Sequence, residues 1–155
     1  LRKQMPDTLV VSVVEHVPAA YWNGQGLYDA RTREVFYPDL SGFRQDLVQL
    51  GAARDSLAPE VYRSAVEFLR LLKGSELVMT SLYLDQVRSY TLTLSVGTRL
   101  RLGRGRELPA ERLKRFLRSY RKAGLKLAEL EYVDLRYDAS FATAPRLSPA
   151  AETAP

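Results

Sequence analysis

The clearest pattern in the chain is a two-residue alternation on both sides of Gly97. Apolar side chains occupy every second position from Tyr90 to Val96, with Thr and Ser between them, and the same period resumes at Leu100 and Leu102. Because successive side chains of a strand point to opposite faces, the pattern predicts an antiparallel hairpin with one buried face. A chain with this hairpin near its centre must form a sheet and cover one of its faces.

Two segments have the helical rather than the two-residue period. One begins at Pro59, carries an apolar stripe that includes Val61 and Phe68, and should end at Gly74. The other begins at Pro109 and has Leu113, Phe116 and Tyr120 in its stripe. Proline is tolerated in the first turn of a helix, and glycine is favoured just after the last. Both segments are therefore expected to be amphipathic helices that cover the sheet.

The remaining apolar segments are strand-length and rich in β-branched or aromatic residues. Residues 46–50 fit either a strand or one helical turn, and the sequence does not decide between them. Because the strands are mostly joined as hairpins and the helices are few, we predict an α+β fold, a mainly antiparallel sheet with two amphipathic helices packed on it. The expected strands lie at residues 9–15, 19–22, 27–30, 34–36, 77–85, 90–96, 99–102 and 127–137.

The end of the chain holds the segment with the most direct functional implication. Residues 131–137 alternate, residues 138–140 form a polar break, and residues 141–143 resume an extended run before Pro145. Proline has no N–H to donate, so we expect pairing to stop there. A last strand at the edge of a sheet would offer free backbone groups to a partner strand. The same pattern also fits a strand in mid-sheet, so both placements stay open.

Composition argues against an enzyme or a metal protein. The 155 residues fit one domain, and they contain no Cys and a single His, so thiolate chemistry and disulfides are excluded. His16 stands beside Glu15 without convergent partners, and such a residue is more often structural than a base or a ligand. Residues 103–106 (GRGR) lack the spacing of a phosphate loop. We expect no catalytic, cofactor or metal site.

Basic residues cluster in one part of the chain. The net charge is +5, and from Arg99 to Lys126 there are eleven Lys or Arg against Glu107 and Glu111. Such a cluster is usually a solvated face, and less often a surface for nucleic acid or anionic lipid. The sheet lacks the aromatic signature of RNA-binding strands, so a basic-surface module at residues 99–126 is kept as the alternative function.

Four stretches together resemble the periplasmic β domain of the bacterial FtsQ/DivIB cell-division family. They are residues 14–23 (VEHVPAAYWN), Tyr28-Asp29-Ala30 with Val35-Phe36, residues 100–105 (LRLGRG) and residues 132–138 (YVDLRYD). On this resemblance, residues 1–17 would be the tail of a truncated POTRA domain, residues 18–145 the β domain and residues 146–155 a disordered tail. The chain does not begin with Met, so we expect a fragment whose membrane anchor is missing.

The resemblance implies a non-catalytic, single-pass inner-membrane divisome protein with this region in the periplasm. Its C-terminal strand would be extended by a strand of FtsB, and FtsB would bring FtsL and other divisome proteins. Arg136 would supply a cation to an acidic FtsB residue, Tyr137 an aromatic contact, and the backbone of residues 139–142 ladder hydrogen bonds. The implied partner-binding residues are Arg136, Tyr137, Asp138, Ala139, Ser140, Phe141, Ala142, Thr143 and Arg88.

The chain departs from the family pattern at three places. Ala139-Ser140 stands where the pattern has Ser-Gly, and Pro145 stands where it has Trp. A family Arg ahead of the central hairpin aligns with Val87, and Arg88 could substitute for it. These changes leave a backbone-mediated mode intact but alter the side chains that would anchor a partner.

Overall fold

The computed structural model describes residues 15–137 and 141–147. Within these residues, nine strands form one sheet in the order β3-β2-β1-β4-β5-β6-β7-β8-β9, accompanied by two α-helices and two short 3-10 helices. The strands are β1 Pro18–Trp22, β2 Gly26–Asp29, β3 Glu34–Phe36, β4 Gln49–Ala52, β5 Met79–Leu84, β6 Ser89–Leu94, β7 Arg99–Arg104, β8 Leu130–Asp134 and β9 Ala142–Pro145. The helices are η1 Asp55–Leu57, α1 Ala58–Leu72, α2 Leu108–Ser119 and η2 Leu127–Glu129.

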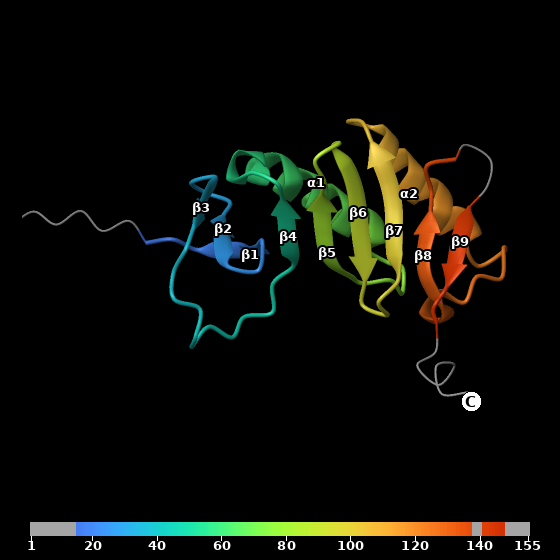
Figure 1. The fold of residues 1–155 in the computed structure, drawn as a ribbon, viewed down its shortest axis with the longest axis horizontal. Helices are drawn as coiled ribbons and strands as arrows, with labels where there is room; N and C mark the ends of the chain where they lie inside the picture. Colours follow the sequence, from blue (N-terminus) through green and yellow to red (C-terminus); the bar gives the residue numbers. More distant parts are fainter. Residues whose placement is uncertain (1–14, 138–140, 148–155) are drawn as a thin grey trace, which may run out of the picture.

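Both α-helices lie on the same face of the sheet (Figure 1). α1 packs against β4 and β5, and α2 packs against β7. The side chains of Leu82, Leu92, Leu100 and Val133 are fully buried in the core on that face. The apolar alternation of the strands therefore faces the apolar stripes of the helices, and the predicted α+β fold with two packed helices is confirmed.

The sheet is mixed, with mostly antiparallel pairing. The antiparallel pairs are β1–β2, β2–β3, β5–β6, β6–β7 and β8–β9, whereas β1–β4, β4–β5 and β7–β8 are parallel. Parallel neighbours need a crossover. α1 lies in the one from β4 to β5, α2 in the one from β7 to β8, and strands β2 and β3 in the one from β1 to β4. The segment at residues 46–50, left open above, contains the start of strand β4.

Several predicted boundaries are wrong, each for a local reason. β6 ends at Leu94, and Val96 lies in the turn with 43% of its surface exposed, because Gly97 (φ 91°) completes that turn. β7 continues through Gly103 and Arg104, two residues past the predicted end of that strand at residue 102. The strand predicted at residues 127–137 is shorter, because η2 occupies its first three residues and β8 ends at Asp134.

Two further differences concern the ends of the chain. Pro145 does not stop pairing, since it lies in β9 opposite Leu130. The strand predicted at residues 9–15 falls almost entirely outside the described residues, as do Asp138, Ala139 and Ser140. The domain division at residue 17 and the tail from residue 146 therefore stay predictions.

Candidate functional site

The last strand lies at one end of the sheet. β9 pairs with β8 on one side, and the sheet order places no strand of the described chain on its other side (Figure 1). Three of its four residues, Ala142, Thr143 and Pro145, are exposed. The sequence left open whether the last strand lies at the edge or in the middle of the sheet, and in the structure β9 lies at the edge. Its free backbone groups are available to another strand.

Arg136 and Asp134 form a fixed pair at the end of β8. Arg136 donates from Nε to Asp134 Oδ1 at 2.8 Å and from Nη2 to Asp134 Oδ2 at 2.6 Å. The Asp134 side chain is almost buried, whereas 47% of the Arg136 side chain is exposed. The hydrogen bonds from Arg136 lower the pKa of Asp134, although its burial acts in the opposite direction. The guanidinium is thus held at the surface in a defined orientation by a carboxylate that stays ionised.

Arg115 of α2 fixes the segment that follows β8. It donates from Nη2 to the carbonyl of Leu135 at 3.1 Å and to the carbonyl of Tyr137 at 2.5 Å. Tyr137 itself is 53% exposed. The helix therefore orients the backbone that carries Arg136 and Tyr137 while their side chains stay accessible. Sequence reasoning assigned Arg115 only to a basic helix face.

β9 is attached to the rest of the fold at both ends. The Phe141 ring packs edge-to-face on Phe116 of α2, with centroids 5.6 Å apart. At the other end, Arg146 donates from Nη2 to the carbonyls of Val96 and Leu130, at 3.0 and 3.3 Å. Phe141 is therefore half-buried against the helix. Sequence reasoning missed Arg146, since no local pattern indicates a contact fifty residues away.

The structure describes six of the nine predicted partner-binding residues. Arg136, Tyr137 and Phe141 to Thr143 lie at the β8–β9 end of the sheet, whereas Asp138, Ala139 and Ser140 lie outside the described residues. Arg88 sits in the β5–β6 turn at φ 64° and forms an ion pair with Glu60 of α1, with 2.5 Å between Nη2 and Oε1. It lines a hollow together with Arg63, Tyr90 and Arg106.

The basic segment at residues 99–126 is partly neutralised by its own surroundings. Arg99 pairs with Glu131 and Lys114 with Glu111, at 2.9 and 3.2 Å. Arg101 stacks over the ring of Tyr132, 3.9 Å from its centroid. The two ion pairs offset part of the positive charge that an electrostatic binder of polyanions would present, whereas the Tyr132 ring and the carbonyls bound by Arg115 engage the guanidinium groups without neutralising them.

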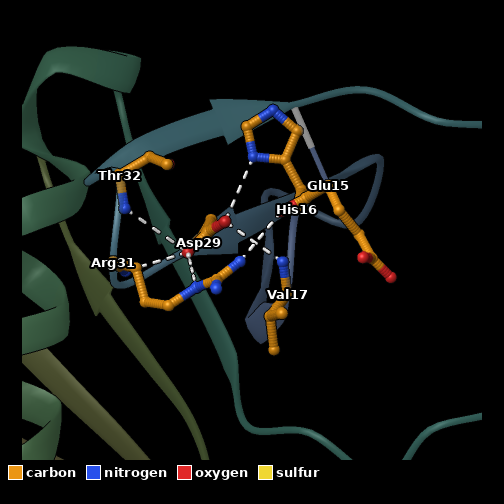
Figure 2. Close-up of polar contacts among 6 residues, drawn as sticks. All are labelled: Glu15, His16, Val17, Asp29, Arg31 and Thr32. Carbon is orange, nitrogen blue, oxygen red and sulfur yellow. Dashed lines mark hydrogen bonds and ion pairs between the residues drawn. The ribbon is translucent and has the colours of Figure 1, made fainter. Parts of the chain in front are cut away.

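A second polar centre lies at the opposite end of the sheet, around Asp29 (Figure 2). Its fully buried carboxylate accepts hydrogen bonds from the backbone N–H groups of Val17 and Arg31, at 3.1 and 2.8 Å, and from Thr32 N at 3.4 Å. His16 Nδ1 lies 3.1 Å from Asp29 Oδ2, and the imidazole stacks on Phe36 with 4.3 Å between centroids.

The pKa of Asp29 shows how strongly this centre holds a charge. Burial raises that pKa, but the hydrogen bonds from Arg31, Val17, His16 and Thr32 outweigh burial and lower it to about 2. An ionised carboxylate accepts hydrogen bonds only, so Nδ1–H of His16 is the donor. Because its lone pairs are directed at fixed donors, Asp29 joins the residues that precede β1 to the β2–β3 hairpin. His16 is structural, as the sequence indicated.

The described residues show no arrangement of side chains for metal binding or for a membrane span. No group of three or more His, Asp or Glu among residues 15–137 and 141–147 could hold a metal ion. Within the same ranges, neither helix is long and apolar enough to cross a bilayer.

Comparison with known proteins relates this architecture to one family. The family described as "Cell division protein FtsQ/DivIB, C-terminal" matches residues 20–136, so the matched region ends just before β9. Cell division protein FtsQ of Vibrio cholerae is 35% identical over 138 residues, covering 89% of this chain and 52% of the relative. FtsQ of Escherichia coli K12 is 34% identical over 146 residues (92% and 52%), and FtsQ of Nitrosospira multiformis is 32% identical over 143 residues (92% and 58%). The chain thus spans about half the length of these relatives.

Proposed function

The chain belongs to the FtsQ/DivIB family of cell division proteins, and from this membership we propose that it is a non-catalytic divisome scaffold that captures a strand of FtsB on the free edge of β9. Through FtsB it would link FtsL and further divisome proteins to septum assembly. The full-length protein would be anchored in the inner membrane by a single span outside this chain, with the present region in the periplasm.

One observation carries the proposal: within the described residues, the short, exposed strand β9 at the end of the sheet has a neighbouring strand on one side only. Addition of a strand to such an edge satisfies backbone groups without demanding particular side chains. This mode tolerates the departures at residues 139 and 140, because a ladder is made by the backbone, whereas Pro145 brings no N–H to that ladder. Arg136, held by Asp134 at the adjacent corner, would then contribute charge complementarity to an acidic residue of the partner.

A titration of the 155-residue chain with a peptide from the membrane-distal part of FtsB, followed by NMR, tests the proposal. We expect saturable shifts concentrated in residues 136–144 and in α2, because the edge strand and its supporting helix respond together. A peptide of the same composition in scrambled order is the control. Shifts confined to the β1–β3 end or to the basic side chains of residues 99–126 would contradict the proposal.

A pair of arginine substitutions tests the role of Arg136. Arg136 and Arg99 have almost equal exposure, 47% and 46%, and each is paired with a carboxylate of the same chain. Arg136→Ala should lower the affinity for the FtsB peptide by about tenfold, the effect of removing one close interfacial charge. Arg99→Ala should leave the affinity unchanged. Equal losses in both variants would indicate general electrostatic attraction instead of a contact at the corner of the edge.

A further inference from the structure

The backbone hydrogen bonds at the two ends of the β8–β9 pair reveal which groups of β9 face outward. Leu135 donates its N–H to the carbonyl of Arg101, on the β7 side, at 2.9 Å. Arg146 donates its N–H to the carbonyl of Glu129, on the β8 side, at 2.8 Å. Successive residues of an antiparallel strand direct their N–H and C=O groups alternately to one side and the other. Each of these two bonds therefore fixes, for every residue of its strand, the side to which the N–H and C=O groups point; we call this the phase of the strand.

The two phases agree. Counting back from Leu135, Tyr132 and Asp134 face β9, and their register partners are Ala144 and Ala142. Counting back from Arg146 along β9 gives the same result, because Ala144 and Ala142 then face β8. The irregularity in the pairing places its extra residue in β8, between Leu130 and Tyr132, so the alternation of β9 is unbroken.

The residues of β9 that face the free edge are therefore Thr143 and Pro145. Thr143 presents both an N–H and a C=O group, whereas Pro145 presents only a C=O group, because proline has no N–H. A proline at this phase leaves the ladder to β8 intact and removes a donor from the outer edge only. Natural sheets use edge prolines in this way to limit pairing with other chains.

We propose that Thr143 is the single backbone donor that β9 offers to a captured strand and that Pro145 ends the edge, so that these two residues fix the register of capture. This inference rests on the proposed function and adds to it the length and phase of the ladder. The partner segment would be an extended chain that exchanges a pair of hydrogen bonds with Thr143. Opposite Pro145 the partner segment can donate a hydrogen bond to the Pro145 carbonyl but cannot accept one, because proline has no N–H.

The edge is set in position before any partner arrives. Arg146 reaches over Gly97, where an added Cβ would lie 2.9 Å from Nη2, and binds the carbonyls of Val96 and Leu130. Phe141 packs on Phe116 at the other end. Because both ends are held, little conformational entropy is lost when a strand binds Thr143, which favours one register over its neighbours.

Hydrogen exchange in the free 155-residue chain is the first test, and it needs no partner. The amide hydrogens of Ala142 and Ala144 should exchange at least about tenfold more slowly than that of Thr143, because the first two are hydrogen-bonded within the sheet. With the FtsB peptide bound, Thr143 should gain protection of about tenfold while Ala142 and Ala144 change little. Protection of Thr143 in the free chain would overturn the assignment of the edge.

Substitutions at the two outward positions provide the second test. Thr143→Pro removes the outward N–H and should lower the affinity for the peptide by at least about tenfold. Thr143→Val keeps the N–H, so its affinity should lie within about twofold of that of the original chain. Pro145→Ala restores an outward N–H, and the new amide at position 145 should become protected when peptide binds, with affinity increased by about fivefold. Melting temperatures within a few degrees of the original chain confirm that each variant is folded.

The outcomes separate this inference from the proposed function. If the original chain does not bind the peptide, the proposed function fails, and the exchange pattern of the free chain still decides which groups face outward. If the chain binds but Thr143→Pro and Thr143→Val are equally affected, or position 145 gains no protection in Pro145→Ala, the register inference is wrong while strand capture stands.

Discussion

The two ends of the sheet are held to the rest of the fold by different kinds of contact. At the β1–β3 end, a buried carboxylate collects hydrogen bonds from the segment before β1 and from the β2–β3 turn, and the His16 ring covers Phe36. At the β8–β9 end, arginines from α2 and from the C-terminal segment bind backbone carbonyls, and the outer strand stays exposed.

The difference teaches what makes an edge suitable for capture. A centre such as Asp29 uses a buried charge to join the segment before β1 to the β2–β3 turn. Arginine contacts to carbonyls instead fix the position of a strand from beneath and from its ends, so its outward backbone groups stay free. A binding edge must be both held in place and left uncovered, and the β9 end meets both conditions.

The largest effect is expected from Asp29→Asn. An asparagine amide would direct N–H groups at the N–H donors of Val17 or Arg31. The polar centre around residue 29 would then lose hydrogen bonds and gain a repulsive contact between donors. We expect the melting temperature to fall by roughly 10 °C, with β9 unaffected in the folded fraction. Asp39→Asn is the matched control, since Asp39 is exposed and accepts a hydrogen bond from Ser41 N alone among described backbone groups. An equal fall in melting temperature in both variants would contradict the stabilising role of the polar centre around Asp29.

The same substitution predicts a change in acid stability. The pKa of Asp29 is lowered in the fold to about 2 from an ordinary 3.8, so the folded state binds its proton less readily than the unfolded state. This stabilisation is complete above pH 3.8 and is lost as the pH falls toward 2. Acid unfolding followed by circular dichroism should therefore show a shallower decline between these pH values for Asp29→Asn than for the original chain.

A smaller effect, confined to binding, is expected from Arg115→Ala. The substitution releases the carbonyls of Leu135 and Tyr137, so the segment carrying Arg136 is no longer oriented by α2. Affinity for the FtsB peptide should fall by about tenfold, mostly through faster dissociation. Arg118→Ala, one turn away on the same helix, removes the same charge and should have little effect. If the two variants lose affinity equally, the contribution of Arg115 is electrostatic and not positional.

The smallest effect is expected from Arg146→Ala. Loss of the contacts to the Val96 and Leu130 carbonyls frees one end of β9, while Phe141 still holds the other. Amide exchange at Ala142 and Ala144 should accelerate by about fivefold, and peptide affinity should fall by about threefold. Leu147→Ala, a change at an 85% exposed neighbour, serves as the control.

An engineered disulfide can confirm that the Arg146 effect is positional. The chain has no Cys, and Tyr132 and Ala144 are register partners across the β8–β9 pair. Replacing both with cysteine should tie the strands together and restore peptide affinity to Arg146→Ala under oxidising conditions only. Failure of the oxidised form to recover affinity would show that Arg146 contributes by another route.

Much of the local structure followed from periodicity. The alternation from Tyr90 to Leu102 predicted the β6–β7 hairpin and its buried face, and the stripes after Pro59 and Pro109 predicted the two helices. These features are set by neighbouring residues, because side-chain direction repeats with the backbone geometry. Errors arose where a turn ended the period, as at Val96, which is exposed despite its position in the pattern.

What the sequence by itself determined is therefore which residues form elements, which face of each is buried, and the charge and chemistry excluded by the absence of Cys. The tertiary structure decided the order of the strands, the position of β9 at the edge and the phase that turns Thr143 and Pro145 outward. The physical reason is the range of the interactions. A strand's pattern specifies its buried face but not its neighbour, and the contacts of Asp29 and Arg146 join residues that only the complete sheet brings together.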